Sequence, residues 1–213
     1  MEIDKNNPPH FWGINSDVHL DFGCGLEEAR NPFQAGSLWG ADILNQPGRK
    51  NYLKTSSNGK LRFGSSKFDS ISAYDVIEHL TREGNPNSFI TFMNEAYRLL
   101  KPNGILICVT PAFPNATVFQ DPTHVNIITD QTINYFVGNN AGAKTLGYGF
   151  EGNFEILKQF WATPRCRIRE RSWNRKISLI SITLQILRNP VKLRLLISNS
   201  INPSHLVWVL RKV

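Results

Sequence analysis

The sequence of 213 residues predicts an α/β fold with a mostly parallel sheet and an antiparallel C-terminal strand. Short apolar runs typical of buried strands recur along the first half of the chain. The clearest helical pattern lies between two of these runs, and a continuous apolar, β-branched run follows it at residues 105–109. Strands that alternate with helices or helix-length connections indicate parallel βαβ units.

The first half contains four expected strands. Residues 18–22 form a short apolar run that ends at Gly23-Cys24-Gly25, which is typical of a buried strand entering a tight turn. Residues 37–43 predict a second strand and residues 68–74 a fourth. A weaker third strand is expected at residues 60–63. These strands form the first half of the predicted sheet.

The clearest helix is expected at residues 86–100, because its apolar side chains recur at the spacing of one buried face. The Lys101–Gly104 segment ends this helix, since proline cannot continue it and asparagine or glycine accepts left-handed geometry. Beyond residue 110, residues 154–161 and 205–210 are expected to be strands that close the sheet. Residues 177–197 predict a helical stretch interrupted at Asn189-Pro190.

The length predicts a single domain, with a cofactor-binding half at about 16–112 and an acceptor half at 113–213. The three cysteines are far apart and form no CxxC pair, so the sequence predicts neither a disulfide framework nor a metal site. The polar N-terminus does not resemble a signal peptide, and no apolar run is long enough to span a membrane. A cytoplasmic protein is expected.

The net charge of +7 is concentrated at the C-terminal end. Residues 1–153 carry 12 basic and 15 acidic residues, whereas residues 154–213 carry 12 basic and 2 acidic residues. Arginines alternate from Arg165 to Arg171, and residues 177–197 mix basic with apolar side chains. This pattern predicts either contact of 165–197 with an anionic membrane surface or ordinary packing on its own domain or on a dimer partner.

The turn at Gly23–Gly25 and the carboxylate at Asp42 together predict a nucleoside site. Glycines let a ligand approach the main chain, and Asp42 follows the second strand, 17 residues after Gly25. A carboxylate there can accept hydrogen bonds from both hydroxyls of a ribose. Glu27 and Glu28, at the expected start of a helix, and Asp21 would repel a pyrophosphate. The ligand is therefore expected to carry a positive group and no phosphate.

Four segments resemble the motifs of class I S-adenosylmethionine-dependent methyltransferases, in the order and spacing of that family. They are Val18–Gly25, Gly40–Ile43, Phe68–Leu80 and Leu99–Leu106, and the resemblance covers residues 16–112. It implies a Rossmann-like doubly wound sheet and S-adenosylmethionine as cofactor. It also implies a cofactor site made of Asp21, Phe22, Gly23, Cys24, Gly25, Asp42, Ile43, Asp75 and Val76.

The resemblance assigns these positions different parts of the cofactor. Asp21 and the glycine turn would hold the ammonium and carboxylate end, Asp42 the ribose, and Asp75 would line the pocket. Leu26 replaces the third glycine often present in the first motif. The aspartate that often reads the adenine amine after the third strand has no counterpart, because residues 55–57 are Thr-Ser-Ser.

The acceptor side is expected after residue 110, at the carboxyl edge of the sheet. Asp121 and His124 lie there in a proline-containing loop, and His124 is a hypothetical general base for an oxygen acceptor. The alternative is that Asp121 caps the turn and His124 orders the loop. His79 is expected to support the loop that follows the fourth strand. Residues 138–150 are expected to form an acceptor wall through Tyr148 and Phe150.

The sequence therefore predicts methyl transfer to a small molecule, a sugar or a lipid-linked glycan. A non-catalytic binding module that keeps the fold is the first alternative. An RNA methyltransferase is disfavoured, because no nucleic-acid-binding module is recognisable and the fourth-strand motif reads Asp-Val-Ile-Glu. A nicotinamide dehydrogenase is disfavoured by the glycine pattern. The oligomeric state is left open.

Overall fold

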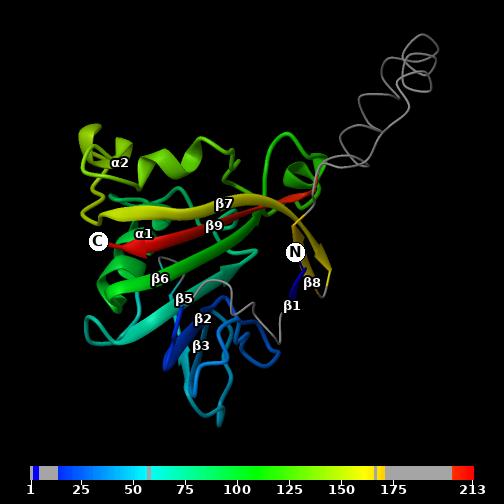
Figure 1. Cartoon of the computed structure of the whole chain (residues 1–213), viewed down its shortest axis with the longest axis vertical. Helices are drawn as coiled ribbons and strands as arrows, with labels where there is room; N and C mark the ends of the chain where they lie inside the picture. Colours follow the sequence, from blue (N-terminus) through cyan, green and yellow to red (C-terminus); the bar gives the residue numbers. More distant parts are fainter. Residues whose placement is uncertain (1, 5–13, 57–58, 166, 171–202) are drawn as a thin grey trace, which may run out of the picture.

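A computed structural model describes residues 2–4, 14–56, 59–165, 167–170 and 203–213. The strands form one nine-stranded sheet in the order β1-β8-β7-β9-β6-β5-β2-β3-β4 (Figure 1). The strands are β1 (Glu2–Asp4), β2 (Val18–Phe22), β3 (Ser37–Asp42), β4 (Tyr52–Lys54), β5 (Phe68–Tyr74), β6 (Leu100–Pro111), β7 (Phe154–Arg165), β8 (Arg167–Glu170) and β9 (His205–Lys212).

One half of the sheet is parallel and the other half is antiparallel. Strands β4, β3, β2, β5 and β6 pair in parallel. Strand β9 pairs antiparallel with both β6 and β7, and β8 continues antiparallel to β7 and β1. The prediction of a mostly parallel α/β sheet with an antiparallel C-terminal strand is confirmed. The β7–β8 hairpin and its pairing with β1 were not predicted.

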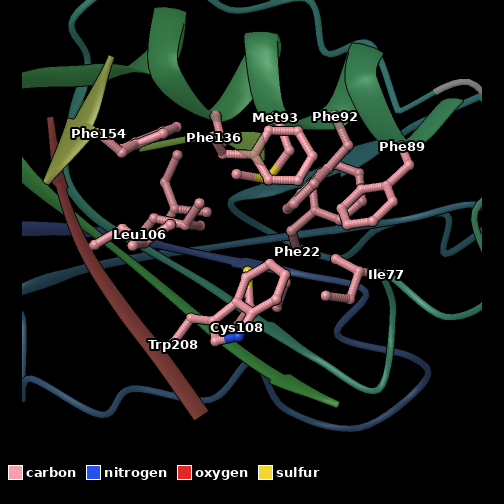
Figure 2. Close-up of a cluster of buried hydrophobic side chains, with 14 of the residues drawn as sticks. Phe22, Ile77, Phe89, Phe92, Met93, Leu106, Cys108, Phe136, Phe154 and Trp208 are labelled. Carbon is pink, nitrogen blue, oxygen red and sulfur yellow. The ribbon is translucent and has the colours of Figure 1, made fainter. Parts of the chain in front are cut away.

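Helix α1 (Ser88–Leu99) covers one face of the sheet. The side chain of Asn87 caps its first turn by accepting a hydrogen bond from Ile90 N at 3.0 Å. Figure 2 shows Phe89, Phe92 and Met93 pointing from α1 toward the strands. They pack into a buried cluster with side chains from the central strands, among them Phe22, Leu106, Cys108, Phe154 and Trp208.

The opposite face of the central strands is also packed. Residues of β6 alternate, so Leu106 and Cys108 face α1 whereas Ile105, Ile107 and Val109 join a second buried cluster. That cluster includes side chains of β5, β7 and β9, and Ile14 and Phe33 pack against it. The sheet is therefore buried on both sides at its centre, which explains the continuous apolar run in the sequence.

The weak strand expected at residues 60–63 is wrong, and the edge strand of the parallel half is β4, before that segment. The main chain of this segment forms hydrogen bonds with side chains of α1 and not with a neighbouring strand. Leu61 N donates to Glu95 Oε1 at 3.0 Å, and Arg98 donates to the carbonyls of Leu61 and Phe63 at 3.2 and 2.8 Å. Short apolar runs do not reveal such side-chain pairing.

The helix expected directly after Gly25 is also absent from the described residues. The segment from Leu26 to Gly36 forms turns and irregular chain between β2 and β3. Pro32 disfavours helical geometry at Asn31, and the side chain of Asn31 instead binds both main-chain groups of Ala35. This loop leads from the carboxyl end of β2 to the start of β3, and the parallel pairing of the two strands places their carboxyl ends side by side.

The segment between β6 and β7 packs beside α1 and contains three short helices, η2 (Ala116–Phe119), η3 (Thr132–Tyr135) and α2 (Gly142–Thr145). Phe150 was expected in an acceptor wall, and this expectation is wrong. Its ring is 4% exposed and packs against Phe136 and Phe154. Tyr148 remains half exposed and stacks on Tyr135 with ring centroids 6.3 Å apart.

Candidate active site

The turn after β2 contains two glycines in the left-handed region, with φ of +77° at Gly23 and +62° at Gly25. A Cβ atom on Gly23 would lie 2.2 Å from Val76 Cγ2, whereas one on Gly25 would meet nothing within 4 Å. Packing against the segment after β5 therefore requires Gly23. Gly25 faces open space, where a ligand can approach the main chain.

Asp42 connects this turn to the end of β3. Its Oδ2 accepts a hydrogen bond from Gly25 N at 2.8 Å, and its Oδ1 accepts one from Leu44 N at 3.0 Å. A carboxylate offers about four lone-pair positions, so two remain for the hydroxyls of a ribose. Beside it, Ile43 is 59% exposed and offers apolar surface to a base. The end of β3 thus suits a nucleoside.

Two side chains that sequence reasoning missed support the same turn. Gln46 and Arg49 both donate to the carbonyl oxygen of Gly25, and Arg49 does so at 3.4 Å. Arg49 also donates to Gln46 Oε1 at 2.5 Å, and its guanidinium lies 5.2 Å from the ring centroid of Tyr52. They lie in a loop without a periodic pattern, so the sequence gives no signal for this contact.

Phe22 and Cys24 belong to the site through their main chain rather than their side chains. The Phe22 ring is buried and lies 4.9 Å from the ring of Phe92. Cys24 is 4% exposed, and burial raises the pKa of its thiol. A Cβ on Gly40 would lie 2.8 Å from Cys24 Sγ, so β3 approaches the turn closely because it carries glycine there.

Asp21 lies behind the turn and is completely buried. It accepts hydrogen bonds from Arg30 N at 2.7 Å and Ser72 Oγ at 2.8 Å, and the Arg30 guanidinium lies 3.7 Å away. Burial raises the pKa of Asp21 to about 6, and the hydrogen bond from Arg30 N acts in the opposite direction. Asp21 therefore supports the loop after Gly25 and presents no surface for the expected contact with the methionine ammonium.

A chain of buried polar side chains leads to Asp21. Because Ser72 Oγ donates to Asp21, it accepts from His19 Nε2 at 2.9 Å. The unprotonated His19 Nδ1 then accepts from Ser70 Oγ at 2.6 Å, and Ser70 accepts from Ser16 at 2.6 Å. Burial lowers the pKa of His19 to about 3, so this hydrogen-bonded series contains a neutral imidazole at His19 and a carboxylate at Asp21.

Asp75 follows β5 with a left-handed φ of +54°, held by a hydrogen bond from its N–H to Val109 O at 2.8 Å. Its side chain is half exposed and accepts from His205 Nε2 at 3.0 Å. His205 begins β9, which runs antiparallel to β6, so a residue 130 positions away reaches the carboxyl edge of the parallel strands. The site predicted from the sequence did not include His205.

Glu78 is buried beneath this edge, with 1% of its surface exposed. Thr110 Oγ1 donates to Glu78 Oε2 at 2.9 Å, whereas the buried Oε1 has no hydrogen-bond partner in the described structure. Burial raises the pKa of Glu78 to about 8, and the charges of Asp75 and Asp121 act in the same direction. One oxygen of this carboxyl group therefore remains available.

His79 and His124 lie side by side, with ring centroids 4.7 Å apart. Thr123 Oγ1 donates to Asp121 Oδ1 at 2.6 Å, so it accepts from His79 Nδ1 at 3.0 Å. His124 Nδ1 donates to Val118 O at 2.9 Å. Each ring therefore carries a proton on Nδ1, and when it carries only that proton, Nε2 is the atom with a free lone pair.

The loop that carries His124 is fastened to the segment after β5. Val125 N and Asn126 N both donate to Glu78 O, at 2.9 and 3.0 Å. The Asn126 side chain donates to the carbonyls of Ile77 and Leu80 at 2.8 and 2.6 Å. These contacts fix the expected acceptor residues against the end of β5. The structure thus adds Glu78 and His79 to the predicted pair of Asp121 and His124.

Asp121 is linked to His79 through the hydroxyl of Thr123. It is exposed, and hydrogen bonds from the Thr123 side chain and main chain lower its pKa. The expectation that His79 only supports its loop is incomplete, because its ring also lies beside the ring of His124. In addition, the sequence predicted no metal site, yet Glu78, His79 and His124 each offer a potential ligand atom, and these atoms lie within 4.8 Å of one another.

Most of the segment 165–197, for which membrane contact is predicted, lies outside the described residues. The structure places Arg165 at the end of β7 and Arg167 and Arg169 in β8. The expected helix at 177–197 falls outside the described chain. Among the described helices, none is long and apolar enough to cross a membrane. The membrane contact and the cytoplasmic location stay predictions.

The sequence matches the protein family described as "Methyltransferase domain" over residues 8–146. It has no match among curated proteins. Similar solved structures include a SAM-dependent methyltransferase from Archaeoglobus fulgidus, with 17% identity, a TM-score of 0.53, and coverage of 96% of this chain and 89% of that chain.

Two further structures give nearly the same result. The YcgJ protein from Bacillus subtilis has 13% identity and a TM-score of 0.51, with 93% of this chain and 92% of that chain covered. An S-adenosylmethionine-dependent methyltransferase from Mesorhizobium loti has 13% identity and a TM-score of 0.50, with the same coverage. At these identities the likeness concerns the fold.

Proposed function

Because the chain belongs to the methyltransferase-domain family, we propose that it transfers a methyl group from S-adenosylmethionine to a hydroxyl oxygen of a small-molecule, sugar or lipid-linked glycan acceptor. The expected class I S-adenosylmethionine-dependent family, and with it the cofactor, is confirmed by the family match and the fold. The acceptor proposal rests on one observation. The pair of His79 and His124 lies at the same sheet edge as Gly25 and Asp42.

The residues at the donor side fit S-adenosylmethionine. Asp42 retains capacity for two ribose hydroxyls, Gly25 faces open space, and Ile43 and Leu26 are exposed apolar side chains. When bound, the cofactor supplies a methyl group on a positively charged sulfur. The half-exposed carboxylate of Asp75 lies at the end of a neighbouring strand and favours a cationic ligand there.

The acceptor side follows from the position of the two imidazoles. Methyl transfer is an in-line displacement, so the acceptor atom must be held opposite the sulfur. A hydroxyl is a poor nucleophile until its proton is drawn away, and imidazole suits this task near neutral pH. The Nδ1 atoms of His79 and His124 make hydrogen bonds, and within the described residues their Nε2 atoms have no hydrogen-bond partner. This cluster favours an oxygen acceptor.

Transfer of a radiolabelled methyl group tests the proposal. The protein is incubated with labelled S-adenosylmethionine and with free sugars, nucleotide sugars, polyprenyl-phosphate-linked sugars or RNA. We expect label in a sugar, recovered after acid hydrolysis as an O-methyl ether by mass spectrometry. Asp42→Ala should lower the rate, whereas Glu155→Gln, which removes an exposed carboxylate on β7, should not.

The competing functions give different results in the same assay. Label recovered only in RNA would replace the acceptor class with the RNA alternative. No transfer to any acceptor, together with retained binding of S-adenosylhomocysteine, would instead support the non-catalytic binding module.

A further inference from the structure

We propose that Glu78, His79 and His124 bind a divalent first-row transition-metal ion, which holds the oxygen of the methyl acceptor. The proposed metal site rests on the proposed function only for this last role. One potential ligand atom from each side chain lies within 4.8 Å of the other two. Two of these residues are adjacent at the end of β5, and the third comes from the loop fastened over it.

The spacing is compatible with a shared ion. Metal–ligand bonds of about 2.1 Å to nitrogen and oxygen place neighbouring ligand atoms about 3.0 to 3.5 Å apart. The most widely separated ligand atoms would therefore have to approach by at most about 1 to 2 Å.

The unpartnered oxygen of Glu78 points independently to a ligand. Glu78 is 1% exposed, and its Oε1 has no hydrogen-bond partner within the described residues. A buried carboxyl oxygen without a partner is unfavourable, because nothing replaces the hydrogen bonds that it made to water in the unfolded chain. Thr110 fixes the other oxygen at 2.9 Å and so orients the carboxyl group. A cation would satisfy the remaining oxygen.

The hydrogen bonds around the histidines are those of metal ligands. A ligating imidazole usually donates its other N–H to a carbonyl or carboxylate, which fixes its tautomer. His124 donates from Nδ1 to Val118 O, and His79 donates from Nδ1 to Thr123, which donates in turn to Asp121. Both Nε2 atoms are thereby prepared to coordinate. Asp121 and Thr123 are positioning residues in this arrangement.

The donor set indicates the class of ion. Two imidazole nitrogens and one carboxylate oxygen suit zinc, iron, cobalt, nickel or manganese better than magnesium or calcium, which prefer oxygen ligands. Three protein ligands leave at least one coordination position open. That open position can take an oxygen of the acceptor.

A bound ion would take over from the imidazoles as the group that activates the acceptor hydroxyl, because an Nε2 atom that coordinates a metal cannot also accept a proton. A divalent cation lowers the pKa of an oxygen acid that it binds, so the acceptor O–H releases its proton to solvent more easily. The bond from acceptor oxygen to methyl carbon then forms as the bond from that carbon to sulfur breaks. The positive sulfonium becomes a neutral thioether, and no electrons enter or leave the site.

Titration with Co²⁺ tests the site, because its visible absorption reports coordination directly. We expect one Co²⁺ per chain, with absorption bands of a nitrogen- and oxygen-coordinated ion. His79→Asn and His124→Asn should each weaken binding by at least about tenfold, and Thr123→Val should weaken it by about 10- to 100-fold. Glu155→Gln is the matched control, since its carboxylate is on β7 and pairs with Arg211.

Glu78→Gln is informative only if the buried variant folds, and circular dichroism shows whether it does. The two histidine variants test the proposal whether or not Glu78→Gln folds. Absence of Co²⁺ and Mn²⁺ binding to the full chain at 1 mM metal, or binding unchanged by both His→Asn substitutions, would overturn the proposal. Calorimetry with S-adenosylhomocysteine on the same samples separates this failure from failure of the proposed function.

Discussion

At the scale of single residues, the two glycines of the first turn have different tasks. Both have left-handed φ angles, so alanine is strained at either position. Only at Gly23 would the added Cβ also collide with Val76. The motif predicted that both glycines matter, but a sequence pattern cannot separate a glycine needed for packing from one needed for a ligand.

Substitution of these glycines separates folding from binding. We expect Gly23→Ala to lower the free energy of unfolding by about 2 to 4 kcal/mol, because strain and overpacking add. Gly25→Ala should cost about 1 to 2 kcal/mol and should mainly weaken binding of S-adenosylhomocysteine. Urea denaturation and calorimetry measure the two effects. Equal loss of stability in both variants would contradict the distinction.

His19 predicts how stability depends on pH. Its folded pKa of about 3 lies below the usual 6.5, so the unfolded chain binds the proton more readily. Stability is therefore fully present above about pH 6.5 and decreases as the pH falls toward 3, by on the order of 4 kcal/mol. The raised pKa of Asp21 acts oppositely, since its contribution decreases as the pH rises from about 4 to 6.

The variant His19→Gln isolates this contribution, because glutamine stays neutral and can still donate and accept. Urea denaturation between pH 4 and 7 should show a smaller acid loss in the variant than in the original protein. An identical pH slope in both proteins would show that His19 is not buried as a neutral ring.

At the scale of elements, local sequence patterns predicted correctly the elements whose stabilising contacts are themselves local. The helix expected at 86–100 is α1 at Ser88–Leu99, and the left-handed residue that follows it is Asn103, with φ of +61°. The strand expected at 60–63 failed because Glu95 and Arg98 bind that main chain from a distant element. Likewise, no local pattern predicts that His79 lies beside His124, because the fold brings the two rings together from separate segments.

The cap of α1 gives a test at this scale. Asn87→Ala removes the acceptor for Ile90 N and should lower the free energy of unfolding by about 1 kcal/mol. Asn87→Asp keeps an acceptor at the same place and should retain most of the stability. Urea denaturation with an unchanged m-value is the measurement. No difference between the two variants would show that the cap contributes nothing.

At the scale of the whole molecule, the sheet explains why the proposed donor and acceptor sites lie at one edge. The carboxyl ends of β2, β3 and β5 lie at one edge because these strands are parallel, and β9 brings His205 to that edge from the opposite direction. The sequence motifs therefore located the Gly23–Gly25 turn, Asp42 and Asp75 at this edge, whereas Asp21 is buried behind the turn. The acceptor side depends on contacts between the β6–β7 segment and the end of β5, which no single motif encodes.

The most direct test of the account is calorimetric titration with S-adenosylhomocysteine. We predict one binding site per chain, with affinity lowered at least about tenfold by Asp42→Ala, since two hydrogen bonds of about 1 kcal/mol each are lost. Glu155→Gln should bind as the original protein does. No binding at millimolar ligand, or binding that Asp42→Ala leaves unchanged, would contradict the assignment of the Gly23–Gly25 turn and Asp42 as the cofactor site.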